Sequence, residues 1–416
     1  MKHWGFSTKA IHLGIDPQNN HGATSIPIYQ TSSFAYSQAE ELAEVFDGNR
    51  FGYIYSRISN PTVTAFEQRI NALENGVGAV ATSSGMAAIF TVLFTLTSQG
   101  DEIVSSKSLF GGTFLLFNRV LSKYGVSVKY VDILDPESIK NAITEKTRAL
   151  FLESIGNPGM DVPDIRKISE ITRAKSIPLI ADSTLTTPCL FNAKEHGVDV
   201  VIHSSTKYIT GNGSTMGGVF IDLGTFEWES LDNKDLKNAA NRAGSEMAFL
   251  NVARRNILMN TGACQSPFNA YLHCMGLETL ELRIEKHCSN ALTLAEYLES
   301  HPAITEINYP GLKDNRFHKI ADNLFNGRYG GLLSFSLPSQ KQCFKLINRL
   351  KLIKNLANLG DAKTLITHPA STIFHECTEE EMREAGVHEG LVRLSVGIED
   401  VKDIIDDLET ALGEVD

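Results

Sequence analysis

The sequence predicts an α/β protein in which a mostly parallel β-sheet flanked by helices precedes a smaller C-terminal α+β domain. Between residues 79 and 203, short apolar runs alternate with helical patterns, as in sheets whose parallel strands are joined by helices. Beyond residue 300 the strand and helix patterns are mixed and less regular. A chain of 416 residues also exceeds what one small core accommodates, which favours at least two domains.

The expected elements follow from the apolar pattern in chain order. An amphipathic helix is predicted over residues 63–73. Short apolar runs predict strands over 79–82, 102–105, 126–131, 147–153, 177–182 and 198–203. A polar stretch over 227–241 interrupts this order. The later patterns predict a long helical region over 266–300, strands near 304–309 and 332–337, and helices near 341–350 and 401–412.

Three parts of the chain are expected. Residues 1–60 carry polar and aromatic clusters but no strong apolar period, so they form a poor core on their own. We therefore predict an N-terminal arm (1–60) that contacts a neighbouring subunit, a large cofactor-binding domain (61–258) and a small C-terminal domain (259–416).

Composition disfavours several classes of function. The net charge of −11 argues against nucleic acids and anionic membranes as partners, because phosphate groups require a basic surface. No apolar stretch approaches the roughly 20 residues that span a bilayer, and the first residues lack the apolar segment of a signal peptide. We therefore expect a cytoplasmic protein. The six cysteines show no CxxC spacing and the histidines no ligand spacing, so neither disulfides nor a metal site is expected.

Two neighbouring predicted strands lead to a lysine and a carboxylate. The run 198–203 is followed closely by Lys207, and the run 177–182 ends at Asp182. In open parallel sheets, ligands bind outside the carboxyl ends of the strands. An amine that forms a Schiff base with an aldehyde, and a carboxylate that keeps a pyridine nitrogen protonated, are what pyridoxal phosphate (PLP) requires. The sequence therefore predicts PLP as the cofactor, with Lys207 and Asp182 as catalytic residues.

A turn after the first predicted strand offers donors for a phosphate. The turn Ser83-Ser84-Gly85 opens a helix, whose first backbone N–H groups bind anions, and Gly85 allows close approach. Ser204 and Thr206 share one side of an extended chain and supply two hydroxyls to the same group. Considered alone, the turn has the alternative reading of an ordinary strand-to-helix connection.

Arg393 lies inside an apolar run, residues 390–397, near the C-terminus. A planar guanidinium binds a carboxylate with two hydrogen bonds, and its burial would otherwise be costly. We interpret Arg393 as the anchor for the carboxylate of an amino-acid substrate. The alternative is an arginine on an edge strand that points to water.

Together these residues resemble motifs of the PLP-dependent enzymes of cysteine and methionine metabolism, over nearly the whole chain. That family includes cystathionine γ-synthase, the cystathionine lyases, methionine γ-lyase and the homoserine-ester sulfhydrylases. The resemblance implies a fold-type I, aspartate-aminotransferase-like architecture and a homotetramer built from catalytic dimers. The motifs that carry it are Ile26–Thr31, Tyr55–Pro61, Ser83–Ala87, Ala181–Thr184, Ser204–Tyr208, His368–Ser371 and Arg393–Gly397.

The resemblance also implies roles for individual residues. Tyr55 and Arg57 are expected to reach the phosphate from the neighbouring subunit, and Tyr55 to help Lys207 move protons. Asn358 and Arg393 are expected to bind the substrate. The full set of implied cofactor contacts is Tyr55, Arg57, Gly85, Met86, Phe110, Asn157, Asp182, Ser204, Thr206 and Lys207.

Several positions favour a homoserine-ester sulfhydrylase within this family. Gly217–Trp228 is similar to the sulfhydrylase pattern, Asn358 stands where the lyases typically have serine, and Gly112 where methionine γ-lyases typically have cysteine. Phe110 replaces the usual ring-stacking tyrosine; it still stacks but has no hydroxyl. The expected reaction is γ-replacement on an O-acylhomoserine, with O-acetyl-L-homoserine as the expected substrate and sulfide or a thiol as the donor. Lys207 removes the α-proton, the acyl group leaves Cγ, and sulfur adds there.

The sequence is also compatible with other functions. γ-Elimination, as in methionine γ-lyase or cystathionine γ-lyase, shares the early steps, and cystathionine γ-synthase activity is a further alternative. A non-catalytic binding protein on the same fold would predict a broken set of site residues, whereas the lysine, aspartate, phosphate donors and arginine are all present.

Overall fold

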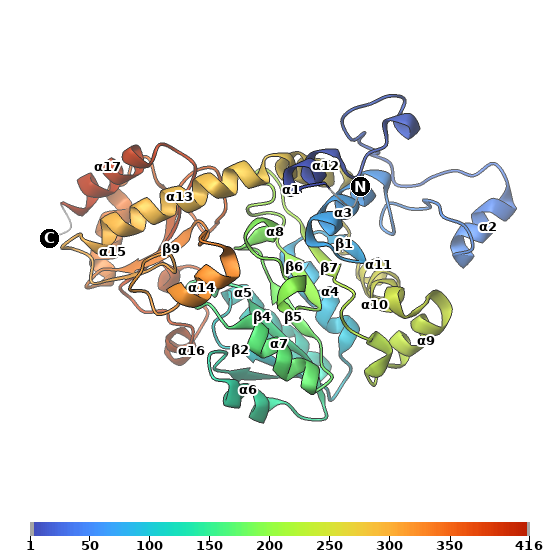
Figure 1. Cartoon of the computed structure of the whole chain (residues 1–416), viewed down its shortest axis with the longest axis horizontal. Helices are drawn as coiled ribbons and strands as arrows, with labels where there is room; N and C mark the ends of the chain where they lie inside the picture. Colours follow the sequence, from blue (N-terminus) through green and yellow to red (C-terminus); the bar gives the residue numbers. More distant parts are fainter. Residues whose placement is uncertain (1–3, 414–416) are drawn as a thin grey trace.

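The computed structural model describes residues 4–413. The larger of its two sheets has seven strands (Figure 1). Its strand order is β1-β7-β6-β5-β4-β2-β3. Only β7 runs antiparallel to its neighbours, so the prediction of a mostly parallel sheet is confirmed. The strands are β1 (Gly78–Thr82), β2 (Glu102–Ser106), β3 (Ser127–Val131), β4 (Thr147–Glu153), β5 (Leu179–Asp182), β6 (Val200–His203) and β7 (Gly218–Asp222).

Both faces of this sheet are buried, which explains the continuous apolar runs. In β4, Leu150 and Leu152 join one apolar cluster, whereas Ala149 and Phe151 join another on the opposite face. Successive residues of a strand point to opposite faces, so a strand covered on both sides is apolar throughout. Helices α3 (Pro61–Glu74), α7 (Ile165–Ala174) and α12 (Pro267–Glu278) contribute to the first cluster, and α4 (Gly85–Leu96) and α10 (Ala248–Val252) to the second.

Local signals define where the main helices begin. Asn60 caps α3 by accepting a hydrogen bond from the Thr62 N–H at 2.9 Å, and Pro61 occupies the first turn, where its missing N–H costs nothing. Asn233 caps α9 (Lys234–Ala243), a helix that begins in the polar stretch 227–241. The remaining helices here are α5 (Gly111–Leu115), α6 (Pro136–Ala142), α8 (Thr187–Leu190) and α11 (Met259–Thr261).

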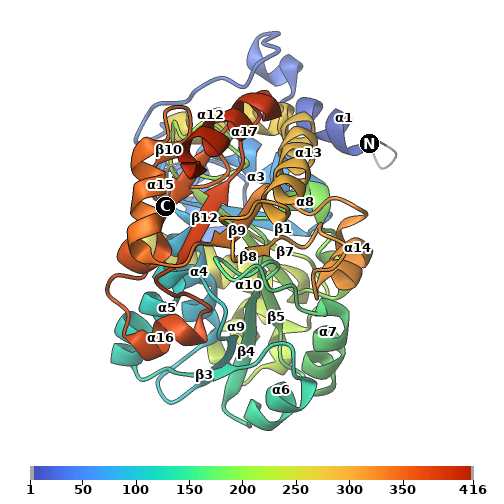
Figure 2. The same cartoon turned by 90° about the vertical axis from the view of Figure 1, so that its left-hand side faces the viewer.

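A second sheet of five strands follows in the C-terminal part, in the order β10-β11-β12-β9-β8 (Figure 2). The first apolar cluster continues without a break from the first sheet into this one, through residues such as Tyr208, Leu333 and Leu394. The strands are β8 (Glu306–Asn308), β9 (Leu332–Ser336), β10 (Lys354–Asn355), β11 (Leu365–Thr367) and β12 (Leu391–Ser395). The helices are α13 (Leu280–Glu299), α14 (His318–Phe325), α15 (Gln340–Arg349), α16 (Glu379–Glu384) and α17 (Val401–Leu412).

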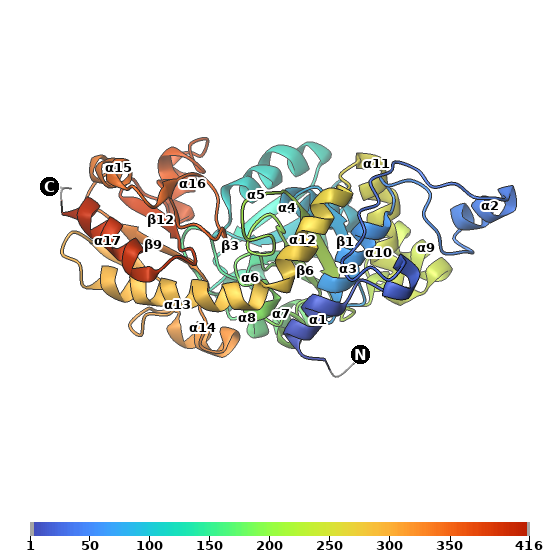
Figure 3. The same ribbon diagram turned by 90° about the horizontal axis from the view of Figure 1, so that it is seen from above.

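The long helical region predicted over 266–300 is two helices, α12 and α13, with a break at Thr279. Helix α12 packs beside α3 of the first sheet, whereas α13 runs on toward α17 and the second sheet (Figure 3). The two halves therefore have different packing partners, which the uniform apolar pattern of the sequence does not distinguish.

The N-terminal residues form an arm on the side of the first sheet (Figure 1). It contains α1 (Phe6–His12), which packs on α3, a 3-10 turn (Pro17–Asn20) and α2 (Ala39–Asp47). Helix α2 lies at the end of loops that stand away from the body in Figure 1. Several large apolar side chains of the arm are exposed, with Phe51 at 82% and Phe46 at 58%.

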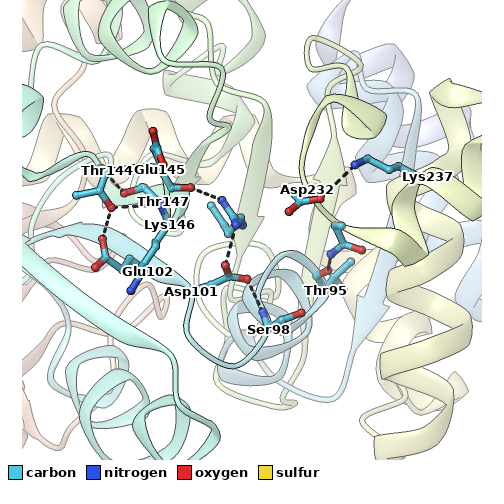
Figure 4. Close-up of polar contacts among 12 residues, drawn as sticks. Thr95, Ser98, Asp101, Glu102, Thr144, Glu145, Lys146, Thr147, Asp232 and Lys237 are labelled. Atoms are coloured by element: carbon cyan, nitrogen blue, oxygen red, sulfur yellow. Dashed lines mark hydrogen bonds and ion pairs between the residues drawn. The ribbon is translucent and has the colours of Figure 1, made fainter.

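Ion pairs connect strands and loops at the amino-terminal end of the first sheet (Figure 4). Glu102, at the start of β2, pairs with Lys129 of β3 at 2.7 Å and accepts a hydrogen bond from the Thr144 hydroxyl at 2.6 Å. Asp101 pairs with Arg148 of β4 at 3.0 Å.

Among residues 4–413, we find no helix with the length and apolar character of a transmembrane segment.

Candidate active site

The carboxyl ends of five strands of the first sheet, β1, β2, β4, β5 and β6, meet at one cavity of about 230 Å³. Residues from the second-sheet region, among them Asn358 and Arg393, complete its lining. Of the twelve residues predicted for the site, all but Tyr55 and Arg57 line this cavity: Gly85, Met86, Phe110, Asn157, Asp182, Ser204, Thr206, Lys207, Asn358 and Arg393.

Lys207 lies in a tight turn that follows β6. A hydrogen bond from its backbone N–H to the Ser204 carbonyl oxygen (3.1 Å) holds the turn, and Lys207 Nζ donates to Asn358 Oδ1 at 2.5 Å. Burial, and secondarily the positive charge of Arg393, lowers the pKa of Lys207 from its ordinary value of 10.5 to about 8. An appreciable fraction of the amine is therefore unprotonated near neutral pH, as a nucleophile or a base requires.

Asp182 is the last residue of β5, and Thr184 holds its carboxylate. The Thr184 N–H donates to Asp182 Oδ1 at 2.9 Å, and the Thr184 hydroxyl also hydrogen-bonds to the carboxylate. Burial raises the pKa of Asp182, and these two hydrogen bonds, with nearby His203, oppose that rise. A cation opposite the carboxylate, such as a protonated pyridine nitrogen, would favour its ionised form.

Donors from two strand ends lie together at the start of α4. Ser84 caps this helix by accepting a hydrogen bond from the Ala87 N–H at 3.1 Å. The N–H groups of Gly85 and Met86 precede the first intrahelical hydrogen bond. A Cβ atom on Gly85 would lie 2.7 Å from Ser204 Cβ, so a side chain there would push the helix start away from the end of β6. With the Thr206 hydroxyl, this arrangement suits a phosphate.

Arg393 lies in the middle of β12, an interior strand, and is only 3% exposed. Its Nη1 donates to Asn157 Oδ1 at 3.2 Å and its Nη2 to the Asn358 carbonyl oxygen at 3.0 Å. Nε has no hydrogen-bond partner among the described residues. Burial lowers the pKa of Arg393 to about 10, which leaves it charged at neutral pH. The alternative of an edge arginine pointing to water is therefore wrong.

Phe110 lies at the start of α5 with its ring beside the cavity. A Cβ atom on Gly112 would lie 2.6 Å from that ring, so a side chain at Gly112 would displace it. The Phe110 N–H donates to Glu153 Oε1 at 2.7 Å, and the Asn157 N–H donates to Glu153 Oε2 at 3.2 Å. One carboxyl group thus links two of the predicted cofactor contacts.

Tyr55 and Arg57 lie on the arm, outside the cavity lining of their own chain. Tyr55 is 42% exposed, and the Arg57 guanidinium lies 5.6 Å from the centre of its ring. Arg57 also donates a hydrogen bond to the Met259 carbonyl oxygen. The structure therefore does not bring this pair to the other ten residues within one chain.

Comparison with protein families identifies the family of the chain. Residues 7–413 match the family model described as Cys/Met metabolism PLP-dependent enzyme. The chain belongs to this family. PLP is accordingly its cofactor, and the fold is that of the fold-type I enzymes of the family.

Individual members of the family are similar over their full length. A homocysteine synthase of Schizosaccharomyces pombe is 41% identical, covering 98% of this chain and 98% of that protein. An L-methionine gamma-lyase of Fusobacterium nucleatum subsp. polymorphum is 39% identical, covering 100% of this chain and 99% of that protein. The crystal structure of a Campylobacter jejuni protein described as an O-acetylhomoserine (thiol)-lyase superposes with a TM-score of 0.93 at 36% identity, covering 99% and 100% of the two chains, and it contains a pyridoxyl-lysine phosphate.

The residues of the cavity fit PLP. The family cofactor combines an aldehyde, a pyridine nitrogen, a phosphate and an aromatic ring, and the lining offers a group for each. These groups are the Lys207 amine, the Asp182 carboxylate, the start of α4 with its hydroxyl donors, and the Phe110 ring. The buried Thr113 hydroxyl also lines the cavity and has no hydrogen-bond partner among the described residues. It is therefore available to hydrogen-bond to a bound cofactor.

Three polar residues of the lining, Thr113, Glu153 and Thr184, had no predicted role. Glu153 ends the predicted strand 147–153 in the same way that Asp182 ends its own strand, so the signal was present. Thr184 lies within a quoted motif but received no role. Its hydroxyl accepts a hydrogen bond from the Ser204 N–H at 2.8 Å and thereby ties the end of β6 to the Asp182 loop.

Proposed function

We propose that this chain catalyses γ-replacement on an O-acylhomoserine, with sulfide or a thiol as the sulfur donor, to form homocysteine or its thioether. The proposal rests on the contacts of Asn358 with two residues. Its side-chain Oδ1 accepts a hydrogen bond from Lys207 Nζ at 2.5 Å, and its backbone carbonyl oxygen accepts one from the buried Arg393. The proposed base, Lys207, and the proposed binding residue for the substrate carboxylate, Arg393, therefore contact the same residue. Similarity to a homocysteine synthase over nearly the whole chain supports the same assignment.

Each residue of the proposed site has a separate role in the reaction. Arg393 binds the substrate carboxylate, and Lys207 moves protons at Cα and Cβ of the substrate. Asp182 keeps a proton on the pyridine nitrogen, so that the bound cofactor can accept the electrons released at Cα. Because Phe110 has no hydroxyl, Lys207 carries these transfers with help only from Tyr55 of a neighbouring subunit. Exclusion of water by the second-sheet region favours addition of sulfur over hydrolysis.

The arm is part of this proposal. Residues 1–60 contact the adjacent subunit, where Tyr55 and Arg57 reach the phosphate, and the catalytic dimers pair into a homotetramer. The exposed apolar side chains of the arm, such as Phe51, support a partner on this surface. We further propose residues 61–258 as the cofactor-binding domain and 259–416 as the small domain.

Product analysis tests the proposed reaction. The purified enzyme is incubated with O-acetyl-L-homoserine, with and without excess sulfide, and both homocysteine and α-ketobutyrate are quantified. We expect homocysteine to dominate when sulfide is present. γ-Elimination is the second candidate, favoured by the similarity to a methionine gamma-lyase. Predominant α-ketobutyrate under excess sulfide would establish elimination and refute the replacement reaction.

A further inference from the structure

We propose that Glu153 is a positioning residue of the active site, whose carboxyl group fixes the residues on either side of the cofactor ring. This inference rests on the proposed placement of the cofactor at Lys207. Glu153 has no role in the reaction described above, yet it lines the same cavity as Lys207 and Asp182.

Glu153 and Asp182 are the last residues of adjacent parallel strands and are partners in register. Register partners point to the same face of a sheet, and adjacent strands are about 4.8 Å apart. The two carboxyl groups therefore lie side by side at the carboxyl edge of the sheet. Glu153 has no ion-pair partner in the described part of the chain.

Two adjacent buried carboxyl groups do not both ionise readily, because each negative charge opposes the other. Asp182 has the stronger support for its charge: two hydrogen bonds from Thr184, nearby His203 and, when PLP is bound, the ring nitrogen. Burial, and then the charge of Asp182, raises the pKa of Glu153 well above its ordinary value, although two backbone N–H groups oppose the rise. Glu153 is therefore the member of the pair that keeps its proton.

The contacts of Glu153 connect the two sides of the site. One carboxyl oxygen accepts from the Phe110 N–H at 2.7 Å and the other from the Asn157 N–H at 3.2 Å. Asn157 in turn accepts a hydrogen bond from Arg393 at 3.2 Å. A single buried side chain thus fixes the residue that covers the cofactor ring and the residue that orients the substrate anchor.

Two substitutions separate charge from position. Glu153→Gln keeps the size and neutrality of the protonated acid and one of the two acceptor oxygens, whereas Glu153→Ala removes both acceptors. The readouts are the dissociation constant of PLP, the pH titration of the visible absorbance of the lysine-linked cofactor without substrate, and KM against kcat. Glu102→Gln, the same change at the opposite end of the sheet, is the matched control.

We expect Glu153→Gln to leave the titration midpoint of the absorbance unchanged, like the control. Removal of an ionised carboxylate would instead lower the midpoint by about one pH unit, the usual scale for a nearby charge, and that shift would overturn the uncharged state. We expect Glu153→Ala to weaken PLP binding and raise KM by about tenfold each, as for the loss of two buried hydrogen bonds, with a smaller change in kcat.

Wild-type PLP affinity and KM in Glu153→Ala would overturn the positioning role. If that variant does not fold, Glu153→Leu, which fills the volume without accepting hydrogen bonds, provides the same comparison. Lys207→Ala tests the underlying placement separately. Loss of the visible absorbance supports it, and absorbance that persists in that variant refutes it whatever the Glu153 variants show.

Discussion

Burial determines the chemistry of individual residues in this site. Lys207 and Arg393 both lose hydration, but with different results, because the guanidinium starts from a much higher pKa. Burial moves Lys207 to a pKa of about 8, close to the working range of a base, whereas Arg393 at about 10 stays charged. The same desolvation thus produces a proton carrier at one position and a permanent anchor at the other.

The pKa of Lys207 predicts the pH dependence of cofactor loading. In the apoenzyme, only the neutral amine attacks the PLP aldehyde, and its fraction grows as the pH rises through about 8. The rate of reconstitution, followed by visible absorbance, should therefore rise between pH 6 and about 8 and level off above it. A rate that continues to climb toward pH 10 would show that the amine is not buried in this way.

Arg393→Lys should impair substrate binding more than the chemical step. Lysine keeps the positive charge but lacks the planar fork that here contacts Asn157 and Asn358 together. We expect KM for O-acetylhomoserine to rise by about 10- to 100-fold, the scale of a lost charge-assisted hydrogen bond, while PLP affinity changes little. Steady-state kinetics and cofactor titration measure the two effects, and an unchanged KM would remove Arg393 from the substrate site.

At the scale of single residues, ten of the twelve residues predicted for the site line the cavity. Lys207, Asp182 and Arg393 stand out as polar residues at or inside apolar runs. Glu153 was equally visible, but its significance depends on lying beside Asp182 across β4 and β5. Strand order is a long-range property, so no local pattern contains that information.

At the scale of elements, the predicted strands agree with the observed ones within a few residues, whereas their arrangement was only partly predictable. The antiparallel insertion of β7 between β1 and β6 depends on contacts across the whole sheet. The break between α12 and α13 lies at Thr279, three residues beyond Gly276 and not at a glycine or proline itself. In both cases tertiary packing, rather than local propensity, decides the structure.

The start of α4 offers a prediction about an element. In Gly85→Ala the new Cβ would lie 2.7 Å from Ser204 Cβ, so the helix start must move away from the end of β6. We expect the free energy of unfolding to fall by about 1–3 kcal/mol, which is typical of overpacking, and PLP affinity to fall by about tenfold or more. Denaturant unfolding of the apoenzyme and PLP titration measure these. Gly5→Ala, where the new Cβ meets no atom within 4 Å, is the control; equal behaviour of the two variants would contradict the crowding.

At the scale of the whole molecule, the exposed arm predicts that each site needs two chains. Arg57→Ala should weaken PLP retention, and Lys207→Ala should be inactive. If Arg57 acts across the subunit boundary, a hybrid dimer of the two variants contains one site with neither substitution. Subunit exchange between them should restore a fraction of wild-type activity. Mixtures that stay inactive despite demonstrated exchange would assign Arg57 to its own chain, where it already contacts Met259.

One apolar cluster extends from the first sheet into the second, and Tyr208, the neighbour of Lys207, belongs to it. Separating the two halves would expose that interior to water on both sides of the boundary. Heating should therefore melt them in one calorimetric transition rather than two. The lysine and the arginine that serve a single substrate would then lose their alignment only when the entire chain unfolds.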